Sequence, residues 1–492
     1  MKTLVVTVIV WGLLLCPFSL QRTFGQGYGD SLTIQGLDHN TIQSAASRAS
    51  GGATILLQDE VGLMFSNPAS LQSLKGIRVS VGGLQHFVTT DQIQQYSPLK
   101  YYSNFSLLME GLTGYIPNPD TSGDNPGDTV QRPYDMIGPN WSHSGNKGLP
   151  IQALIGVPLT IGGSRFTAGL GVVQYENLNQ CYQNNNVLSP SIGSERSLHP
   201  VLRPPNDSTP TSVQWYQYLR SRDGSIRGYG VSLSGSASDK ISFGLSGMIL
   251  KGSTDDYEQR VGRGTLVFYT NYFRLDSVYQ HVTRTGTSDY SGQEFTLSGI
   301  YRGRYLSLGF SVKPPTTITR TYSTIMQNDT TGLSSTITLT GEDKVQLPWR
   351  GTAGMSIAVA PNVTFGLEYE IRSFESAVYT DPTGKESSPW LSASVLHVGA
   401  EYHPLPWLAL RAGMRGQAEV FQEEGNPIDG EPVSYSIYSA GFGVSYQSLR
   451  LNIAYEYGQM KYQDLWQTNV NINIESRYSI VADVVYEVPP LW

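Results

Sequence analysis

From about residue 76 to the C-terminus, the chain repeats short segments in which every second residue is apolar. In one segment the apolar positions are Leu408, Leu410, Ala412 and Met414, and the residues between them are Ala409, Arg411, Gly413 and Arg415. The same alternation runs through 363–372 and 438–446. A period of two is typical of a β-strand whose two faces meet different surroundings. The sequence therefore predicts an all-β protein whose strands are apolar on one face.

The charged residues in these segments predict which face looks outward. A charged side chain would cost about 2 kcal/mol or more against acyl chains. We therefore expect the charged positions to line an interior, namely Arg411, Arg415, Glu368 and Glu370. In lipid every backbone N–H and C=O needs an internal partner, and a closed sheet leaves no free edge. A barrel also explains a hydrophobic fraction of only 39 %, because its apolar residues need not form the runs of about 20 that membrane helices require.

The connections between the segments alternate in length. Short links occur at 161–163, 238–239, 302–304, 360–362, 403–406 and 447–448, and long polar stretches lie near 89–148, 177–225, 258–290, 323–345, 376–389, 421–433 and 464–474. Outer-membrane barrels have tight periplasmic turns and long extracellular loops, whereas a soluble β-sandwich has no reason to sort its loops this way. Counting strands between the links predicts a 14-stranded antiparallel transmembrane β-barrel over residues 76–492, located in the bacterial outer membrane.

The N-terminus predicts a signal peptide over residues 1–25. Lys2 supplies the positive charge, and residues 3–15 form an apolar core of secretory length. Cleavage after Gly25 would remove Cys16 and leave Cys181 as the one remaining thiol, so no internal disulfide is expected. The alternative, a lipoprotein anchored at Cys16, is disfavoured because Leu15 stands where a small residue is wanted.

Residues 26–75 do not alternate, and we expect them to form an N-terminal plug, or hatch, inside the lumen. A short helix is predicted at 40–48, followed by a compact, turn-rich stretch before a first strand at 77–87. The apolar residues of this segment would otherwise face water, namely Ile55, Leu56, Leu57, Leu63, Met64 and Phe65.

The plug segment resembles the FadL/TodX family of outer-membrane transporters of long-chain fatty acids and hydrophobic compounds. Residues 46–53 read Ala-Ser-Arg-Ala-Ser-Gly-Gly-Ala, Asp59 follows, and residues 65–71 read Phe-Ser-Asn-Pro-Ala-Ser-Leu. This order is similar to the family's plug signature, and further likeness lies in 242–246 and in Leu347-Pro348. The chain departs from the family in its long first and second loops and in its end at Trp492 without a strand-final Phe.

The resemblance implies passive uptake of a hydrophobic compound, which is captured outside, enters an apolar pocket and is released when the plug rearranges. Candidate ligand-binding residues in the plug are Phe65, Asn67, Pro68 and Ala69, although the last three also suit a purely structural turn. Candidates in the third loop are Phe268, Tyr272 and Phe273, within an apolar patch that an extended strand would explain equally well. Residues 105–112 of the first loop are spaced for an amphipathic helix.

Arg411 and Arg415 are further ligand-binding candidates, because a lumenal guanidinium group is able to hold the carboxylate of a fatty acid. The same holds for Arg477, and the alternative role of the three arginines is to pair with lumenal carboxylates, which is the commoner fate of charges in such a position. The carboxylates expected for such pairs are Glu368, Glu370, Glu456 and Asp483.

Other classes of function receive little support. The seven His residues are scattered, with no zinc-protease pattern, and no Gly-x-Ser-x-Gly elbow is present, so we expect no enzyme, no metal and no cofactor. A barrel lipase built around His397 or His403 is the remaining enzymatic alternative. A net charge of −7 without a Lys/Arg cluster argues against nucleic acid. The expected partners of this monomer are a hydrophobic ligand, outer-membrane lipid and the assembly machinery, and the rival functions are an open porin, a protein-secretion shuttle of the type IX kind and a surface attachment factor.

Overall fold

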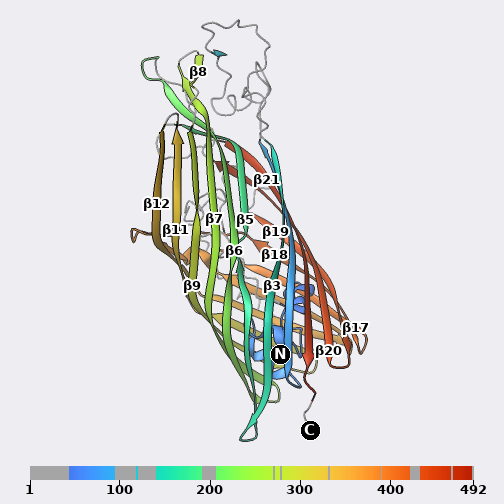
Figure 1. Ribbon diagram of the computed structural model, residues 1–492. Coiled ribbons are helices and arrows are strands. Elements are labelled where there is room, and N and C mark those ends of the chain that lie inside the picture. Colours follow the sequence, from blue (N-terminus) through green and yellow to red (C-terminus); the bar gives the residue numbers. More distant parts are fainter. Residues whose placement is uncertain are drawn as a thin grey trace, which may run out of the picture.

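The computed structural model describes residues 44–94, 118–119, 140–190, 207–269, 272–276, 280–330, 333–388, 390–420, 433–466 and 469–489. These residues form a closed, antiparallel barrel of 14 strand positions (Figure 1). Closure comes from β1, which pairs with β21 over the whole of its length. The predicted architecture and strand number are confirmed.

Four of the 14 positions are each built from two consecutive strands. In chain order the wall consists of β1 (Arg78–Gln94), β3 (Trp141–Ile161), β4 (Ser164–Asn177) with β5 (Gln180–Pro190), β6 (Thr211–Ser238), β7 (Ile241–Phe268), β9 (Gln280–Arg302), β10 (Leu306–Lys313) with β11 (Thr316–Thr330), β12 (Leu333–Leu347) with β13 (Arg350–Ala360), β14 (Val363–Arg372) with β15 (Val378–Thr380), β17 (Val395–Leu405), β18 (Leu408–Ala418), β19 (Ser434–Tyr446), β20 (Leu449–Trp466) and β21 (Asn469–Glu487). Short additions are β2 (Asn118–Pro119), β8 (Tyr272–Asp276) and β16 (Glu386–Ser387).

The predicted short links are the turns at one end of the barrel. Each of the six joins two strands that pair with each other, and the link predicted at 403–406 lies slightly later, between Leu405 and Leu408. In the β3–β4 turn, Gly162 and Gly163 have φ values of 59° and 82°, which glycine adopts without steric cost. The start of β1 and the end of β21 both lie at this end of the barrel, as an even number of strands requires (Figure 1).

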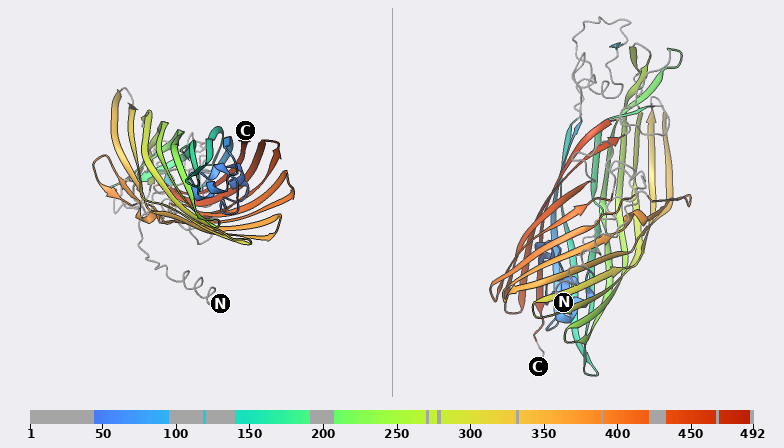
Figure 2. Two further views of the ribbon diagram at one scale, coloured as in Figure 1. Left: turned by 90° about the horizontal axis from the view of Figure 1, so that it is seen from below. Right: turned by 180° about the vertical axis from the view of Figure 1, so that it is seen from behind.

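Three of the predicted long polar stretches consist largely of paired strands in their described residues, and in the first of them, 177–225, β5 pairs with β6 from Gln180 to Pro190. β7 pairs with β9 as far as Val261, and β11 pairs with β12 up to Thr330 and Leu333. The stretch at 258–290 is rich in Thr, Val and Tyr and the stretch at 323–345 is rich in Thr, residue types that favour strands, and hairpin pairing satisfies the backbone groups. The wall made by β6, β7, β9, β11 and β12 therefore rises well above the short strands β14, β17 and β18 (Figures 1 and 2).

The two faces of the wall differ as the alternation predicts. On β14, Leu367 and Ile371 are 42 % and 52 % exposed, while Glu368 between them is 4 % exposed. On β18, Leu410 faces outward and Arg411 is buried inside. A band of exposed Leu, Ile, Val, Phe and Tyr side chains surrounds the barrel, which is the surface that a bilayer requires.

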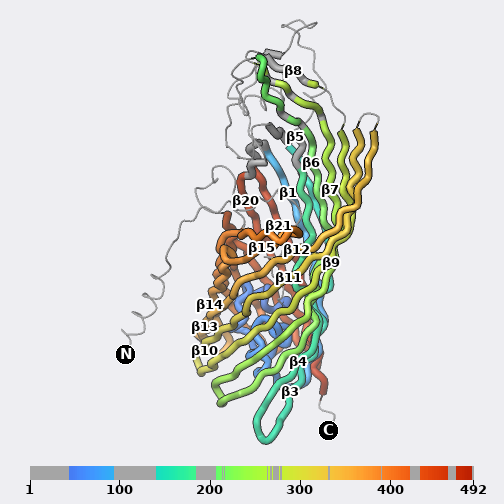
Figure 3. The backbone as a smooth tube through the Cα atoms, turned by 90° about the vertical axis from the view of Figure 1, so that its left-hand side faces the viewer, coloured from blue at the N-terminus to red at the C-terminus, as the bar shows by residue number. Residues whose placement is uncertain are grey.

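Residues 44–75, the described part of the predicted plug, lie inside the barrel near the end with the short turns, and we call them the plug (Figures 2 and 3). The plug contains α2 (Ala45–Ala49) and two 3-10 helices, η1 (Val61–Leu63) and η2 (Pro68–Ser73). The observed helix covers the second half of the predicted one. All six apolar side chains expected to be buried are at most 3 % exposed, and they belong to Ile55, Leu56, Leu57, Leu63, Met64 and Phe65.

Several sequence predictions lie outside the described residues. They include the signal peptide with Cys16, the amphipathic helix at 105–112 and the C-terminal Trp492. Cys181 is described on β5, where it is a free thiol, and burial raises its pKa. Among the described residues, no helix is long and apolar enough to cross a membrane.

Candidate functional site in the lumen

The plug is attached to the inner wall first through α2. Asp483 on β21 accepts a hydrogen bond from the backbone N of Ala45 at 2.7 Å, at the first residue of the helix. Arg48 in the last turn donates to Glu456 on β20 at 2.8 Å. The guanidinium group and the carboxylate are both almost fully buried, so removing Glu456 would take a charged partner away from the buried Arg48.

The Gly-Gly turn of the plug signature lies flat against the backbone of β17 and β18. Gly51 and Gly52 have φ values of 68° and 83°, a region that other residues rarely adopt. The wall opposite also lacks side chains: a Cβ on Gly413 would meet the backbone N of Gly51 at 2.2 Å, and one on Gly399 would meet the O of Ser50 at 2.3 Å. Glycines on both sides therefore permit the close approach of plug and wall.

Arg411 and Arg415 face the lumen on β18 beside α2, and both are engaged by carboxylates. Arg415 donates to Glu456 at 2.5 Å, and this carboxylate also holds Arg48 of the plug. Arg411 donates to Glu401 at 2.7 Å and to Asn452 at 3.1 Å. These contacts agree with the alternative that the two arginines pair with carboxylates.

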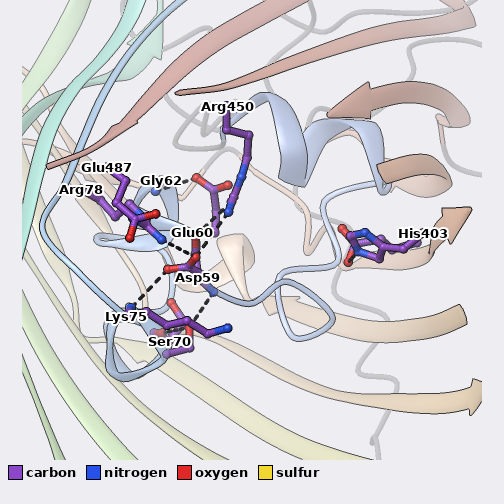
Figure 4. Close-up of polar contacts among 11 residues, drawn as sticks. Asp59, Glu60, Gly62, Ser70, Lys75, Arg78, His403, Arg450 and Glu487 are labelled. Carbon is purple, nitrogen blue, oxygen red and sulfur yellow. Dashed lines mark hydrogen bonds and ion pairs between the residues drawn. The ribbon is translucent and has the colours of Figure 1, made fainter. Parts of the chain in front are cut away.

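A second attachment centres on Asp59, the acidic residue of the plug signature (Figure 4). Its carboxylate accepts hydrogen bonds from Arg78 at 2.6 Å and from Arg450 at 3.3 Å, which come from β1 and β20. Its backbone N donates to Ser73 at 2.8 Å, in a conformation with φ 54°. Arg78 also pairs with Glu487 at the end of β21. Asp59 therefore joins the plug to both sides of the seam where the barrel closes.

The third attachment is the Phe-Ser-Asn-Pro-Ala stretch, which meets β7 and β9. The backbone N of Ala69 donates to Ser298 at 2.8 Å, and Thr296 donates to the carbonyl of Phe65 at 3.1 Å. A Cβ on Gly244 would meet Ala69 N at 2.3 Å, so this contact also depends on a glycine in the wall. The candidates Phe65, Asn67, Pro68 and Ala69 are thus together and buried at one face of the plug.

Asn67 is the exception among these well-bonded groups. The side chain precedes η2 and is 5 % exposed, and its Oδ1 atom has no hydrogen-bond partner among the described residues. A buried acceptor without a partner costs about 1–3 kcal/mol. The plug turn therefore has an unsatisfied polar atom next to its contact with the wall.

Above the plug, apolar side chains form a continuous buried cluster, which we call the lumen column. It begins at Met64 and Phe65, continues along the wall, and reaches the segment between β14 and β17. The principal members beyond the plug are Leu154, Val173, Ile226, Met248, Leu250, Tyr290, Ile318, Val345, Phe374 and Trp390. Since lumens of water-filled barrels are polar, an apolar column of this length is a feature to be explained.

The charged side chains beside the column are paired. Glu294 accepts hydrogen bonds from Lys313 at 2.7 Å, Arg350 at 2.6 Å and the hydroxyl of Tyr175 at 2.7 Å. Higher in the wall, Arg320 forms a bidentate contact with Asp343. The described cations here are neutralised within the protein.

The third-loop candidates lie elsewhere. Phe268 ends β7 and pairs with Phe273 on β8, and Tyr272 pairs with Asn118 on β2, above the tall wall (Figure 1). The strand extension offered as the alternative is what the backbone forms. The structure therefore does not bring these three residues to the plug candidates, and their side chains are outside what it describes.

Sequence reasoning missed Arg78 and Arg450, and it named Glu456 and Asp483 as partners of lumenal arginines but not as groups that fasten the plug. The alternation of side chains predicts that Glu456 and Asp483 face the lumen. It does not predict which plug residues they contact, because that depends on the folded position of the plug. His397 Nδ1 donates a hydrogen bond to the carbonyl oxygen of Gly51, 2.8 Å away, and His403 contacts Glu401, so each histidine has a structural neighbour. In the described part of the chain, no group of three His, Cys, Asp or Glu residues is placed to hold a metal.

No family model matches the sequence, and no curated protein matches it. Solved structures do match. The fold is similar to that of a Pseudomonas aeruginosa FadL homologue, with TM-score 0.57, 12 % identity and coverage of 90 % of this chain and 98 % of that one. It is also similar to the Pseudomonas putida toluene transporter TodX, with TM-score 0.52, 14 % identity and coverage of 90 % and 98 %. A third is the Ralstonia pickettii toluene transporter TbuX, with TM-score 0.51, 15 % identity and coverage of 91 % and 99 %. The likeness that the plug signature indicated is thus confirmed for the fold.

Proposed function

We propose that this chain, which has the fold of the FadL and TodX barrels, carries hydrophobic compounds across the bacterial outer membrane by passive diffusion. The observation that carries the proposal is the lumen column, because it places apolar side chains along the path from the tall wall to the plug. An apolar solute gains about 25 cal/mol for each Å² removed from water, so such a path lowers the cost of crossing a polar surface layer. No catalytic step is involved.

In this proposal the column and the plug are closed in the resting state. The column side chains are at most 9 % exposed, so a ligand must displace some of them. Phe65 belongs to both the column and the plug turn, and ligand entering beside it would press on the turn that contains Asn67, Pro68 and Ala69. Movement of that turn would give Asn67 the partner that it lacks and would open the way to the periplasm.

The ligand that suits this lumen best is neutral. Lys313, Arg350 and Arg320 already have carboxylate partners, so an acid head group would have to compete for them. The binding of a fatty-acid carboxylate by Arg411 and Arg415 remains the alternative within this proposal. Replacing both by Gln should affect uptake of a neutral hydrocarbon and of a fatty acid to the same extent if the ligand is neutral. It should weaken fatty-acid uptake selectively if the two arginines bind the carboxylate.

The direct test compares two isoleucines of β11. Ile318 is buried in the column, whereas Ile325 is 51 % exposed on the outer face. We expect Ile318→Asn to slow uptake of a monoaromatic hydrocarbon into liposomes severalfold or more, because it puts an unpaired amide in the path, and Ile325→Asn to behave like the unaltered protein. Equal rates for all three proteins would overturn the proposal.

A role as a secretion shuttle or surface attachment factor is the second candidate. The observation that favours it is the tall wall of β6, β7, β9, β11 and β12, which extends beyond the apolar band (Figure 1). Capture of a defined secreted protein on this wall, together with no hydrocarbon uptake by the unaltered barrel, would select this function instead.

A further inference from the structure

A row of basic and hydroxyl side chains crosses the outer face of the tall wall. Register partners on adjacent strands place Arg227 on β6 beside Lys251 on β7, and Lys251 beside Ser291 on β9. The row continues through Thr319 on β11 to Lys344 on β12. These strands lie side by side in the front of the barrel (Figure 1). We call these five residues the basic row.

The side chains of the basic row point away from the lumen. Residues next to them along each strand are buried inside: Ile226 and Leu250 are fully buried, and Ile318 and Val345 are at most 3 % exposed. Because successive side chains alternate between faces, Arg227, Lys251, Thr319 and Lys344 are on the outer face. The three cations are classed as exposed.

The Arg227–Lys251 end of the basic row lies directly above the lipid-facing band. The next outward residue towards the short turns is Tyr229 on β6 and Ile249 on β7, and these are 46 % and 55 % exposed. Lys251 is the eleventh residue of β7, counted from Ile241 beside the short turn. A tilted β-strand needs about 9–11 residues to cross the hydrocarbon core. Arg227 and Lys251 therefore fall at the level of the lipid headgroups, on the side of the membrane away from the short turns.

The charges in the row are not balanced within the protein. Arg227 and Lys251 are direct neighbours of like charge, an arrangement that destabilises a pair of strands, and neither forms an ion pair with the described residues. Lys344 contacts Glu342 at 3.1 Å, with both side chains half exposed. Another carboxylate near the row belongs to Asp289, which stands two residues before Ser291 on β9. It is on the same outer face as Ser291 and further from the bilayer.

We propose that the basic row binds the phosphate group of a lipid in the adjoining leaflet. Arg227 and Lys251 supply the positive charge, since guanidinium groups bind phosphate oxygens with two parallel hydrogen bonds and ammonium groups bind them as point charges. Ser291, the register partner of Lys251, supplies a hydroxyl donor beside it, and Tyr229 and Ile249 contact the acyl chains below. The occupant is a membrane lipid and not free phosphate, because the row is continuous with the apolar band.

The experiment counts lipids retained on the purified barrel by native mass spectrometry, with phosphatidylglycerol as the probe and phosphatidylcholine as the uncharged comparison. Each cation near a membrane surface contributes about 1 kcal/mol, so Arg227→Gln/Lys251→Gln should weaken phosphatidylglycerol binding about 30-fold. The exchange Arg227→Lys/Lys251→Arg should retain it. Binding of phosphatidylcholine should be the same in all variants.

The matched control is Lys240→Gln/Arg304→Gln, which removes the same net charge from exposed positions in the β6–β7 and β9–β10 turns at the opposite end of the barrel. We expect it to retain phosphatidylglycerol. The proposal is overturned if the control loses as much lipid as the row variant, if the row variant loses none, or if inorganic phosphate displaces the lipid as effectively as more phosphatidylglycerol does. A heat-dependent shift in electrophoretic mobility, unchanged between variants, shows that each barrel is folded.

Discussion

At the scale of single residues, the plug is held by contacts that tolerate little change. At Gly51 and Gly413, the absence of side chains allows the backbones of plug and wall to approach each other. At other positions, charged side chains hold the plug to the wall. These two kinds of contact fail in different ways, because an added methyl group pushes the plug away whereas a lost charge leaves a buried partner unpaired.

The glycine contact predicts a sharp difference between two positions of β18. A Cβ at Gly413 would overlap Gly51, while one at Gly416 would meet nothing within 4 Å. We expect Gly413→Ala to loosen the plug at a cost of about 1–3 kcal/mol, seen as faster proteolysis of the plug in detergent, and Gly416→Ala to leave the rate unchanged. The close approach would be discredited by equal proteolysis of the two variants.

The charged contact predicts that Asp59→Asn weakens the plug while preserving its shape. The amide keeps the side-chain size but removes the charge that faces Arg78 and Arg450. We therefore expect the free energy of unfolding of the purified barrel, measured by thermal unfolding, to fall by about 1–3 kcal/mol. Asp239→Asn, in the exposed β6–β7 turn, is the matched control and should have no effect. An unchanged unfolding midpoint for Asp59→Asn would show that the carboxylate is dispensable.

At the scale of elements, the contact between the plug turn and β9 must break during transport. The backbone N of Ala69 and the hydroxyl of Ser298 are 2.8 Å apart, so cysteines at both positions should form a disulfide in a Cys181→Ser background. We expect hydrocarbon uptake to fall under oxidising conditions and to recover fully with a reductant. Uptake that is equally fast in the oxidised protein would mean that ligand leaves without movement of this turn.

The strands also show how far the sequence alone could be read. Alternation such as Leu367, Glu368, Tyr369 predicted which face is lumenal, because a charge in lipid is too costly to permit the other orientation. The loops predicted at 177–225, 258–290 and 323–345 contain paired strands, and the sequence does not show this because outward residues are as polar as loop residues once a strand leaves the bilayer. Composition does not distinguish a solvated strand from a loop, and only pairing with a neighbour does.

The candidate site was predictable in part for a similar reason. The plug signature brought Phe65, Asn67, Pro68 and Ala69 to attention, and all four are buried together. Glu456 was among the lumenal carboxylates predicted as partners for arginines such as Arg415, and the two residues do pair. The contact of the same carboxylate with Arg48 was not predictable, because it depends on how the plug and the wall fold together. Likewise, the residues of the lumen column come from strands that are far apart in the sequence. Their apolar character alone does not distinguish them from the apolar residues that face lipid.

At the scale of the whole molecule, the barrel should be closed to the passage of ions. Lipid bilayers containing the intact chain should show little ion conductance, because the plug and the column fill the lumen, whereas a variant without residues 26–75 should show large open-channel steps. This comparison separates the proposed function from that of an open porin. Equal conductance of the two proteins would mean that the plug does not close the pore.

The most direct measurement of the central claim is a crystal structure of the barrel soaked with a brominated aromatic hydrocarbon, in which anomalous scattering locates the bromine. The account predicts a bromine site within the lumen column, between Phe65 of the plug and Tyr290 of the wall. Bromine found only on the outer, lipid-facing surface, at concentrations that saturate uptake, would contradict it.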